Sequence, residues 1–239
     1  MEYKEIEWEG FSGIEFEFDG LNAKLIKPNV KPNGKWALKT EYFGAFPALE
    51  VELLNRGWHI AYNENYNRWG QERDVVRKCE FIRFISSEFS LDKKCAIVGM
   101  SCGGMYGVKT AAMAPELISV LYLDAPVINY LSCPCGLGVA ANDLFEEFHN
   151  ITGLTISQML SYRDNPLDKL DILVKNNIPV ILVAGDSDTV VPYCENGALL
   201  EEYYNKNGGQ LEVHIKPGCD HHPHGLEDSN IIADYIEKF

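Results

Sequence analysis

The most constraining feature of this sequence is a series of short apolar segments that alternate with segments of helical spacing. Residues 95–99 read Cys-Ala-Ile-Val-Gly, an unbroken apolar run, and the runs at 120–123 and 179–184 are of the same kind. Strands with this pattern are covered on both faces, which is typical of a parallel sheet. Their alternation with helices predicts an α/β fold, in which helices cover both faces of a mainly parallel sheet.

The remaining segments fit this plan. Residues 14–18 alternate apolar and acidic side chains and are joined to a second strand at 23–26 through Asp19-Gly20, which predicts an antiparallel N-terminal hairpin. Three further strands are predicted at 36–38, 58–62 and 211–215, and helices at 47–56, 71–89, 103–114 and 228–239.

Two of the predicted helices carry a clear apolar stripe. In the helix at 71–89 the stripe is expected to be buried, with Val76 beside it and most charged residues, such as Asp74, Arg77 and Lys78, outside it. In the final helix, Ile231 is expected to face inward together with its apolar neighbours.

The chain has 239 residues, a length that suits one domain with a substantial core, so we expect residues 1–239 to form a single domain. Residues 129–178 separate two core strands by far more than a usual connection. Such inserts are often lids or binding elements, and we expect a small, partly helical lid here. An additional packing layer without a role in binding is the alternative.

Composition excludes some classes of partner. The formal net charge of −14 disfavours nucleic acid and anionic membrane surfaces, since both are negatively charged. The N-terminal residues 1–5 are charged and form no apolar signal segment. Seven cysteines, an odd number, favour reduced thiols. We therefore expect a cytoplasmic protein that does not bind membranes.

The motif with most chemical content is Gly99-Met100-Ser101-Cys102-Gly103. It follows the strand at 95–99 and opens the helix at 103–114, which is the strand–turn–helix arrangement of a nucleophile elbow. Such a turn holds the serine in a strained conformation and aims the N-terminus of the helix at the reacting group. Ser101 is the predicted nucleophile, and the Cys102 N–H is a predicted oxyanion donor.

A serine hydroxyl needs a base that is oriented by an acid. The stretch Gly185-Asp186-Ser187-Asp188 follows the strand at 179–184 and therefore lies at the same sheet edge as Ser101. Asp188, farther out on the loop, is the predicted orienting acid. Asp186, which suits a cap of the turn, and Asp124, which follows the strand at 120–123, are the alternatives.

The base is predicted in the loop beyond the strand at 211–215, where three of the six histidines lie within four positions. His221 is the predicted base and His222 the alternative, while His224 is expected to support the loop. A competing interpretation is a metal site built from these histidines with cysteines such as Cys219, or Cys133 and Cys135. We expect neither a metal nor a cofactor, since a serine triad needs none.

These motifs resemble the α/β-hydrolase superfamily, whose pattern the chain follows from the hairpin to the final helix. The resemblance rests on the elbow at 99–103, the Gly-Asp-x-Asp-x-Val-Val-Pro stretch at 185–192 and the histidine loop at 218–224. Residues 36–44 and 121–127 are further similar to a bacterial group described as α/β hydrolases or esterases. The resemblance implies an α/β-hydrolase fold and ester hydrolysis.

The chain departs from the superfamily in the loop that often supplies the second oxyanion donor, which here reads Thr40-Glu41-Tyr42-Phe43-Gly44. By position, the N–H of Tyr42 or of Glu41 is expected to serve. Trp69 and Tyr130 are expected to provide aromatic walls that bind substrate, with simple packing of the loops as an equal alternative.

The sequence therefore predicts a serine hydrolase that cleaves a small-molecule carboxylic ester through an acyl-enzyme. An amide or peptide hydrolase with the same triad is the alternative, which the absence of a large N-terminal domain disfavours. A binding protein on an inactive hydrolase scaffold is a third hypothesis, although no triad member is missing.

Overall fold

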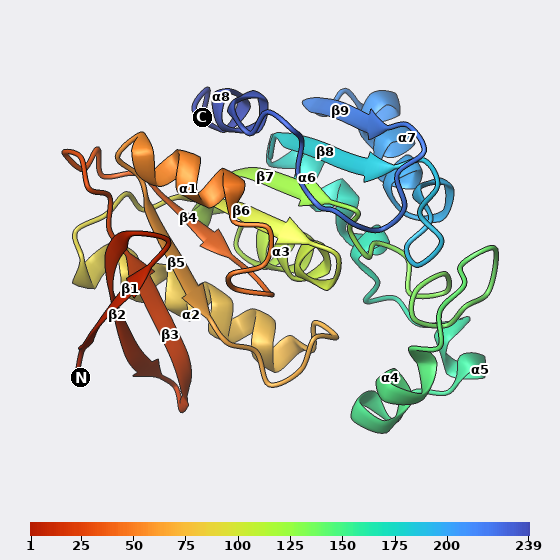
Figure 1. Ribbon diagram of the computed structural model, residues 1–239. Coiled ribbons are helices and arrows are strands. Elements are labelled where there is room, and N and C mark those ends of the chain that lie inside the picture. The colour runs from red at the N-terminus through yellow and green to blue at the C-terminus, as the bar shows by residue number, and fades with distance from the viewer.

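A computed structural model describes residues 1–239 and contains one sheet of nine strands in the order β1-β2-β3-β5-β4-β6-β7-β8-β9 (Figure 1). The strands are β1 Lys4–Trp8, β2 Phe11–Phe18, β3 Leu21–Ile26, β4 Trp36–Lys39, β5 His59–Asn63, β6 Cys95–Met100, β7 Ile118–Asp124, β8 Val180–Gly185 and β9 Leu211–Lys216.

The six strands from β4 to β9 are parallel, whereas β1, β2 and β3 form antiparallel pairs at the N-terminal edge. The mainly parallel sheet and the antiparallel hairpin are therefore confirmed. Because β6, β7, β8 and β9 run in the same direction, the loops after them meet at one edge of the sheet.

Six main helices cover the two faces of the sheet: α1 Ala48–Asn55, α2 Glu72–Glu88, α3 Cys102–Met113, α6 Leu170–Lys175, α7 Gly197–Asn207 and α8 Asn230–Ile236. α1 and α8 lie together on one face, where they bury a cluster of 19 residues with the sheet (Figure 1). α2, α3, α6 and α7 contribute to a cluster of 28 residues with the other side chains of the sheet. This is the two-sided covering that the unbroken apolar strands require.

The connection from β7 to β8 has two parts. Its first part carries α4 Phe145–Thr152 and α5 Ile156–Met159, which extend away from the sheet beyond its carboxyl edge (Figure 1). The sequence predicted a lid over residues 129–178; because α6 packs in the main core, we call only residues 129–165 the lid. A third cluster of ten buried residues joins the lid to the start of α3. The second part contains α6, whose Leu170 and Leu173 belong to the main core.

Several sequence expectations are corrected. β1 and α7 were not predicted, and Val76 and Ile231 are exposed rather than inward. The charged side chains of Asp74, Arg77 and Lys78 are buried.

Those buried charges are explained by the loop that they support. Arg77 donates to Asp74 at 2.9 Å and to the Glu64 carbonyl, while Asp74 accepts from the Tyr66 N–H at 3.0 Å. Burial lowers the pKa of Lys78 to about 7. The polar face of α2 thus holds the loop between β5 and α2 at the carboxyl edge of the sheet.

No helix combines the length and apolarity needed to cross a bilayer.

Candidate active site

Ser101 occupies the sharp turn between β6 and α3, with φ 51° and ψ −120°. A non-glycine residue is rarely found in this region of conformational space, and such strain is typical of functional turns. The flanking glycines explain how the turn fits. A Cβ on Gly99 would lie 2.8 Å from the Gly103 carbonyl oxygen, and one on Gly103 would lie 3.1 Å from the Thr40 hydroxyl.

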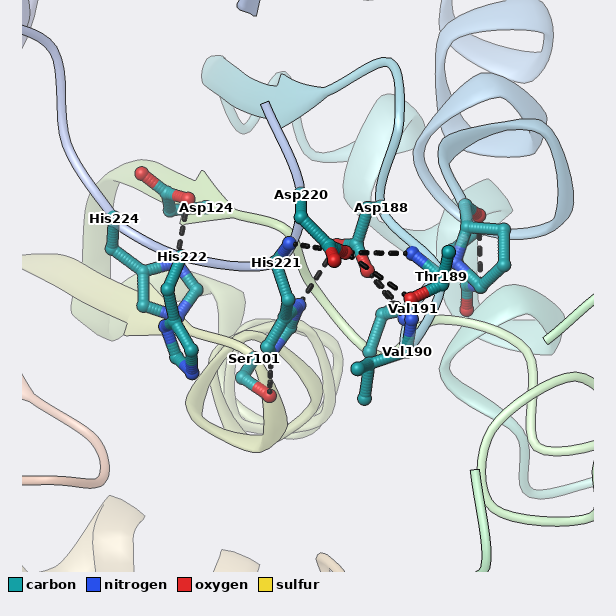
Figure 2. Close-up of polar contacts among 12 residues, drawn as sticks. Ser101, Asp124, Asp188, Thr189, Val190, Val191, Asp220, His221, His222 and His224 are labelled. Carbon is teal, nitrogen blue, oxygen red and sulfur yellow. Dashed lines mark hydrogen bonds and ion pairs between the residues drawn. The ribbon is translucent and has the colours of Figure 1, made fainter. Parts of the chain in front are cut away.

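His221 connects Ser101 to Asp188 (Figure 2). Its Nε2 lies 3.1 Å from the Ser101 Oγ, and its Nδ1 lies 2.8 Å from the Asp188 Oδ2. Asp188 and His221 are only 6% and 8% exposed. With Nδ1 donating to the carboxylate, Nε2 is left to accept the serine proton. The structure therefore brings together the three residues that the sequence singled out.

Backbone groups fix the two loops that carry this arrangement. The second oxygen of Asp188 accepts from the N–H groups of Val190 and Val191 at 2.9 and 2.8 Å. Asp220 accepts from the N–H groups of Thr189 and His221, at 2.9 and 2.8 Å, and so ties one loop to the other (Figure 2). These two backbone hydrogen bonds lower the pKa of the exposed Asp220 carboxyl.

The alternative acids have other partners. Asp186 accepts from the Gly218 N–H at 2.7 Å and from the Ser187 hydroxyl, so it caps the turn as the sequence suggested. Asp124, at the end of β7, lies 2.8 Å from His224 Nδ1. It also accepts from the Tyr122 hydroxyl and the Gly225 N–H, both at 2.6 Å.

The histidine loop thus supplies the histidines of two histidine–aspartate pairs, with His222 between them (Figure 2). His222 is exposed, and its ring is stacked on Phe46 with centroids 5.5 Å apart. Phe46 also meets His224 edge to face at 5.2 Å. Partial burial, followed by repulsion from His221 and His224, lowers the pKa of His222.

A cavity of about 390 Å³ opens at Ser101 and His221. Most of its lining is apolar. The lining residues are Tyr42, Ala45, Phe46, Arg68, Met100, Ser101, Cys102, Cys133, Leu144, Val190, Val191, His221, His222 and His224. The lid contributes Cys133 and Leu144, and Arg68 supplies the only Lys or Arg side chain of the wall.

The family comparison agrees with this geometry. Residues 55–239 match the model of the prolyl oligopeptidase family of peptidases. The chain belongs to this family. The family is part of the α/β-hydrolase superfamily, so the resemblance derived from the motifs is confirmed.

Solved structures that superpose on the chain confirm the fold. A puromycin-hydrolyzing peptidase of Mycobacterium tuberculosis superposes with a TM-score of 0.72 at 14% identity, over 95% of this chain and 38% of its own. A puromycin hydrolase gives 0.69 at 17% identity, over 91% and 36%. The acylaminoacyl peptidase of Pyrococcus horikoshii gives 0.67 at 14% identity, over 92% and 37%. The chain spans little more than a third of the length of these proteins.

Of the three oxyanion donors predicted from the sequence, Cys102 and Tyr42 line the cavity together with Ser101, whereas Glu41 does not. The Cys102 N–H begins α3, and no protein group accepts its hydrogen bond. Tyr42 lines the cavity and has φ 55°, so its backbone is held in the left-handed region. The Glu41 side chain points to Asn65 and accepts weakly from the Tyr42 N–H at 3.4 Å. Burial raises the pKa of this Glu41 carboxyl.

Trp69 and Tyr130 do not line the cavity. Both are 1% exposed and belong to the cluster that joins the lid to α3. The Tyr130 hydroxyl donates to the Trp69 carbonyl at 3.1 Å, and both rings meet Phe148 edge to face. The expectation that they form substrate-binding walls is corrected: they pack the lid, which was the alternative.

The residues that replace them in the cavity wall were missed. Phe46 ends the loop predicted at 40–46, and Val190 and Val191 lie within the motif at 185–192, so their positions were an available signal. Arg68 and Leu144 gave no signal, because their directions depend on how the lid packs. Arg68 donates to Glu147 of α4 at 2.9 Å, and Trp69 Nε1 donates to the same carboxylate at 3.0 Å.

The cysteines near the site are ordinary buried thiols. Cys102 and Cys133 are both free, and burial raises the pKa of Cys102 to about 11. A thiol with a raised pKa is a poor nucleophile and a poor metal ligand at neutral pH.

Proposed function

We propose that this protein is a serine peptidase that cleaves an amide bond in short aminoacyl or peptidyl substrates. Ser101 is the nucleophile, His221 the base and Asp188 the orienting acid. The observation that carries the proposal is the 3.1 Å separation of Ser101 Oγ from His221 Nε2, with Asp188 at 2.8 Å from Nδ1.

The proposed amide substrate replaces the ester that the sequence favoured. The prolyl oligopeptidase family match over residues 55–239 favours amide cleavage, and the neighbours are a puromycin-hydrolyzing peptidase, a puromycin hydrolase and an acylaminoacyl peptidase.

The first half of the reaction follows from the hydrogen bonds. His221 Nε2 takes the proton of Ser101 as Oγ attacks the carbonyl carbon, and Asp188 stabilises the imidazolium through Nδ1–H. The negative oxygen is stabilised by the Cys102 N–H, with the Tyr42 or Glu41 N–H as second donor. His221 then gives its proton to the leaving amine.

The second half returns the enzyme to its starting state. Water enters where the amine left and loses a proton to His221 Nε2 as it attacks the acyl carbon. The proton then passes back to Ser101 Oγ when the acid is released. No cofactor takes part in these steps.

The cavity supports a small apolar group on the acyl side. Its volume of about 390 Å³ suits a single large side chain rather than a long polymer segment. An apolar group is favoured by the wall residues Phe46, Met100, Leu144 and Val191. The one cation of the wall, Arg68, is already paired with Glu147.

A paired substrate screen tests the proposal. Aminoacyl and dipeptidyl amidomethylcoumarins with apolar residues would be compared with short-chain p-nitrophenyl esters. We expect amide turnover that Ser101→Ala abolishes and that Ser12→Ala, at an exposed position of β2, leaves unchanged. Turnover confined to esters would refute the peptidase but keep the serine hydrolase. Activity that survives Ser101→Ala would refute the site itself.

A further inference from the structure

Three imidazole rings gather at the mouth of the site. The ring centroids of His221, His222 and His224 lie 4.8, 5.1 and 4.9 Å apart, each pair edge to face. One ring nitrogen from each residue lies within 4.8 Å of one from both others. Only one of the three is needed as the base of the proposed reaction.

Two of the three rings are oriented as metal ligands usually are. His221 and His224 each present Nδ1 to a buried carboxylate, Asp188 or Asp124, at 2.8 Å. Metal-binding histidines commonly donate one N–H to a carboxylate, which fixes the ring and leaves the other nitrogen free for the ion. In both residues, that other nitrogen is Nε2.

The third ring is able to move. His222 is exposed, and its contacts are with the face of Phe46 and with the other two rings. A tetrahedral zinc ion with bonds of about 2.0–2.1 Å needs nitrogens roughly 3.3 Å apart. Rotation of the His222 side chain, together with small shifts of the His221 and His224 rings, would bring the nitrogens from within 4.8 Å to this separation.

We propose that His221, His222 and His224 form a binding site for a divalent transition-metal ion such as zinc, and that the bound ion switches the hydrolase off. Imidazole nitrogens favour zinc, copper or nickel over magnesium or calcium, which prefer oxygen ligands. The three rings are neutral ligands when they bind, and the fourth position is open to water or to the Ser101 hydroxyl.

Inhibition follows from competition for one lone pair. The His221 Nε2 lone pair accepts the Ser101 proton in the proposed reaction, so it is not available to the serine while it binds an ion. Metal binding and catalysis therefore exclude each other. This half of the inference rests on the proposed function, whereas metal binding by the cluster does not.

Binding is measured directly with Co²⁺ and Zn²⁺ on protein first treated with a chelator. We expect Co²⁺ to give the visible absorption of a tetrahedral nitrogen site at one ion per chain, and Zn²⁺ to remove it. His222→Ala should weaken binding at least tenfold. His214→Ala, a histidine on β9 that pairs with Glu212, is the matched control and should bind as the unchanged protein does.

Inhibition is measured on the amide or ester substrate that the enzyme turns over. Zn²⁺ should abolish turnover, and a chelator should restore it. The zinc concentration for half inhibition should rise at least tenfold in His222→Ala, relative to the metal-free rate of that variant. It should not change in His214→Ala.

The binding and inhibition experiments test the metal site separately from the proposed peptidase function. Ser101→Ala is expected to bind Co²⁺ although it is inactive, so a failure of catalysis leaves the metal site testable. No visible band and no bound ion, or binding that is equal in His222→Ala, would overturn the site. Stoichiometric binding without loss of turnover would overturn its role as a switch.

Discussion

The two histidine–aspartate pairs at the carboxyl edge of the sheet have the same bond but different surroundings. In each, a histidine Nδ1 lies 2.8 Å from an aspartate oxygen, and all four residues are buried. His221 has Ser101 on its other nitrogen, whereas His224 has no serine there. A carboxylate orients a histidine, but only a nucleophile beside the free nitrogen makes the histidine a catalytic base.

The aspartates differ as well. Asp124 is fully buried at the end of β7, and its oxygens also accept from Tyr122 and Gly225, so the pair anchors the histidine loop to the sheet. Asp188 lies on a loop, and apart from His221 its partners are backbone N–H groups alone. We infer that the Asp188–His221 pair takes part in the reaction and that the Asp124–His224 pair anchors the histidine loop.

The largest contrast is expected between the histidines themselves. His221→Ala should lower kcat by about a millionfold, because removal of the base disables the triad as a unit. His224→Ala should lower kcat by less than about a hundredfold, through a loosened loop. Steady-state kinetics on purified, folded variants would decide. Similar losses of kcat in both variants would contradict the assignment of His221 to catalysis and of His224 to loop support.

The next contrast concerns the acids. Asp188→Asn should reduce kcat about ten-thousandfold, because the amide favours the wrong tautomer of His221. Asp124→Asn keeps the shape of the anchor and should change kcat by less than about tenfold. If the amide at position 124 proves the more damaging, the catalytic pair has been misassigned.

The free energy of unfolding should show the opposite order, with the larger loss on removal of Asp124 than of Asp188. Asp124→Ala leaves the buried Tyr122 hydroxyl and the Gly225 N–H without their acceptor, which should cost about 3–4 kcal/mol. Asp188→Ala removes the acceptor of the Val190 and Val191 N–H groups but of no buried hydroxyl, and should cost about 1–2 kcal/mol. Urea unfolding of both variants measures the difference, and a reversed order would contradict the anchor.

The smallest effect is expected at Asp220, which joins the loops of the catalytic pair and has no counterpart in the other. Asp220→Asn should reduce kcat by less than about tenfold. Because folding lowers the pKa of this carboxyl, its stabilising effect is present above its unfolded value and is lost as the pH falls through the folded one.

The Asp220 effect is read from thermal melts across pH. The melting temperature of Asp220→Asn should lie below that of the unchanged protein at neutral pH and approach it as the pH falls below about 3.8. A gap that stays constant into strong acid would show that the carboxylate charge is not what joins the loops.

The sequence predicted the reacting residues because each lies in the loop that follows a strand of a parallel sheet. Ser101 comes after β6 and Asp188 after β8, and parallel strands bring such loops to one edge. The unbroken apolar strands likewise predicted helices on both faces. The order of the chain alone was enough to bring these groups together.

The cavity wall was not predictable in the same way. The directions of the Trp69 and Tyr130 side chains depend on how a long connection packs. Both side chains pack in the cluster that joins the lid to α3. Lys78 looked exposed by helical spacing but is buried to hold a loop. The motifs also do not predict whether an ester or an amide bond is cleaved, because esterases and peptidases share fold and triad.

Labelling with a fluorophosphonate probe tests the central claim most directly, since the probe reacts only with an activated serine. We predict one adduct per chain, located on Ser101 by mass spectrometry of the digested protein. The adduct should be absent in Ser101→Ala and His221→Ala and present in Asp124→Asn. An adduct on another serine, or unchanged labelling of His221→Ala, would contradict the assignment of Ser101, His221 and Asp188.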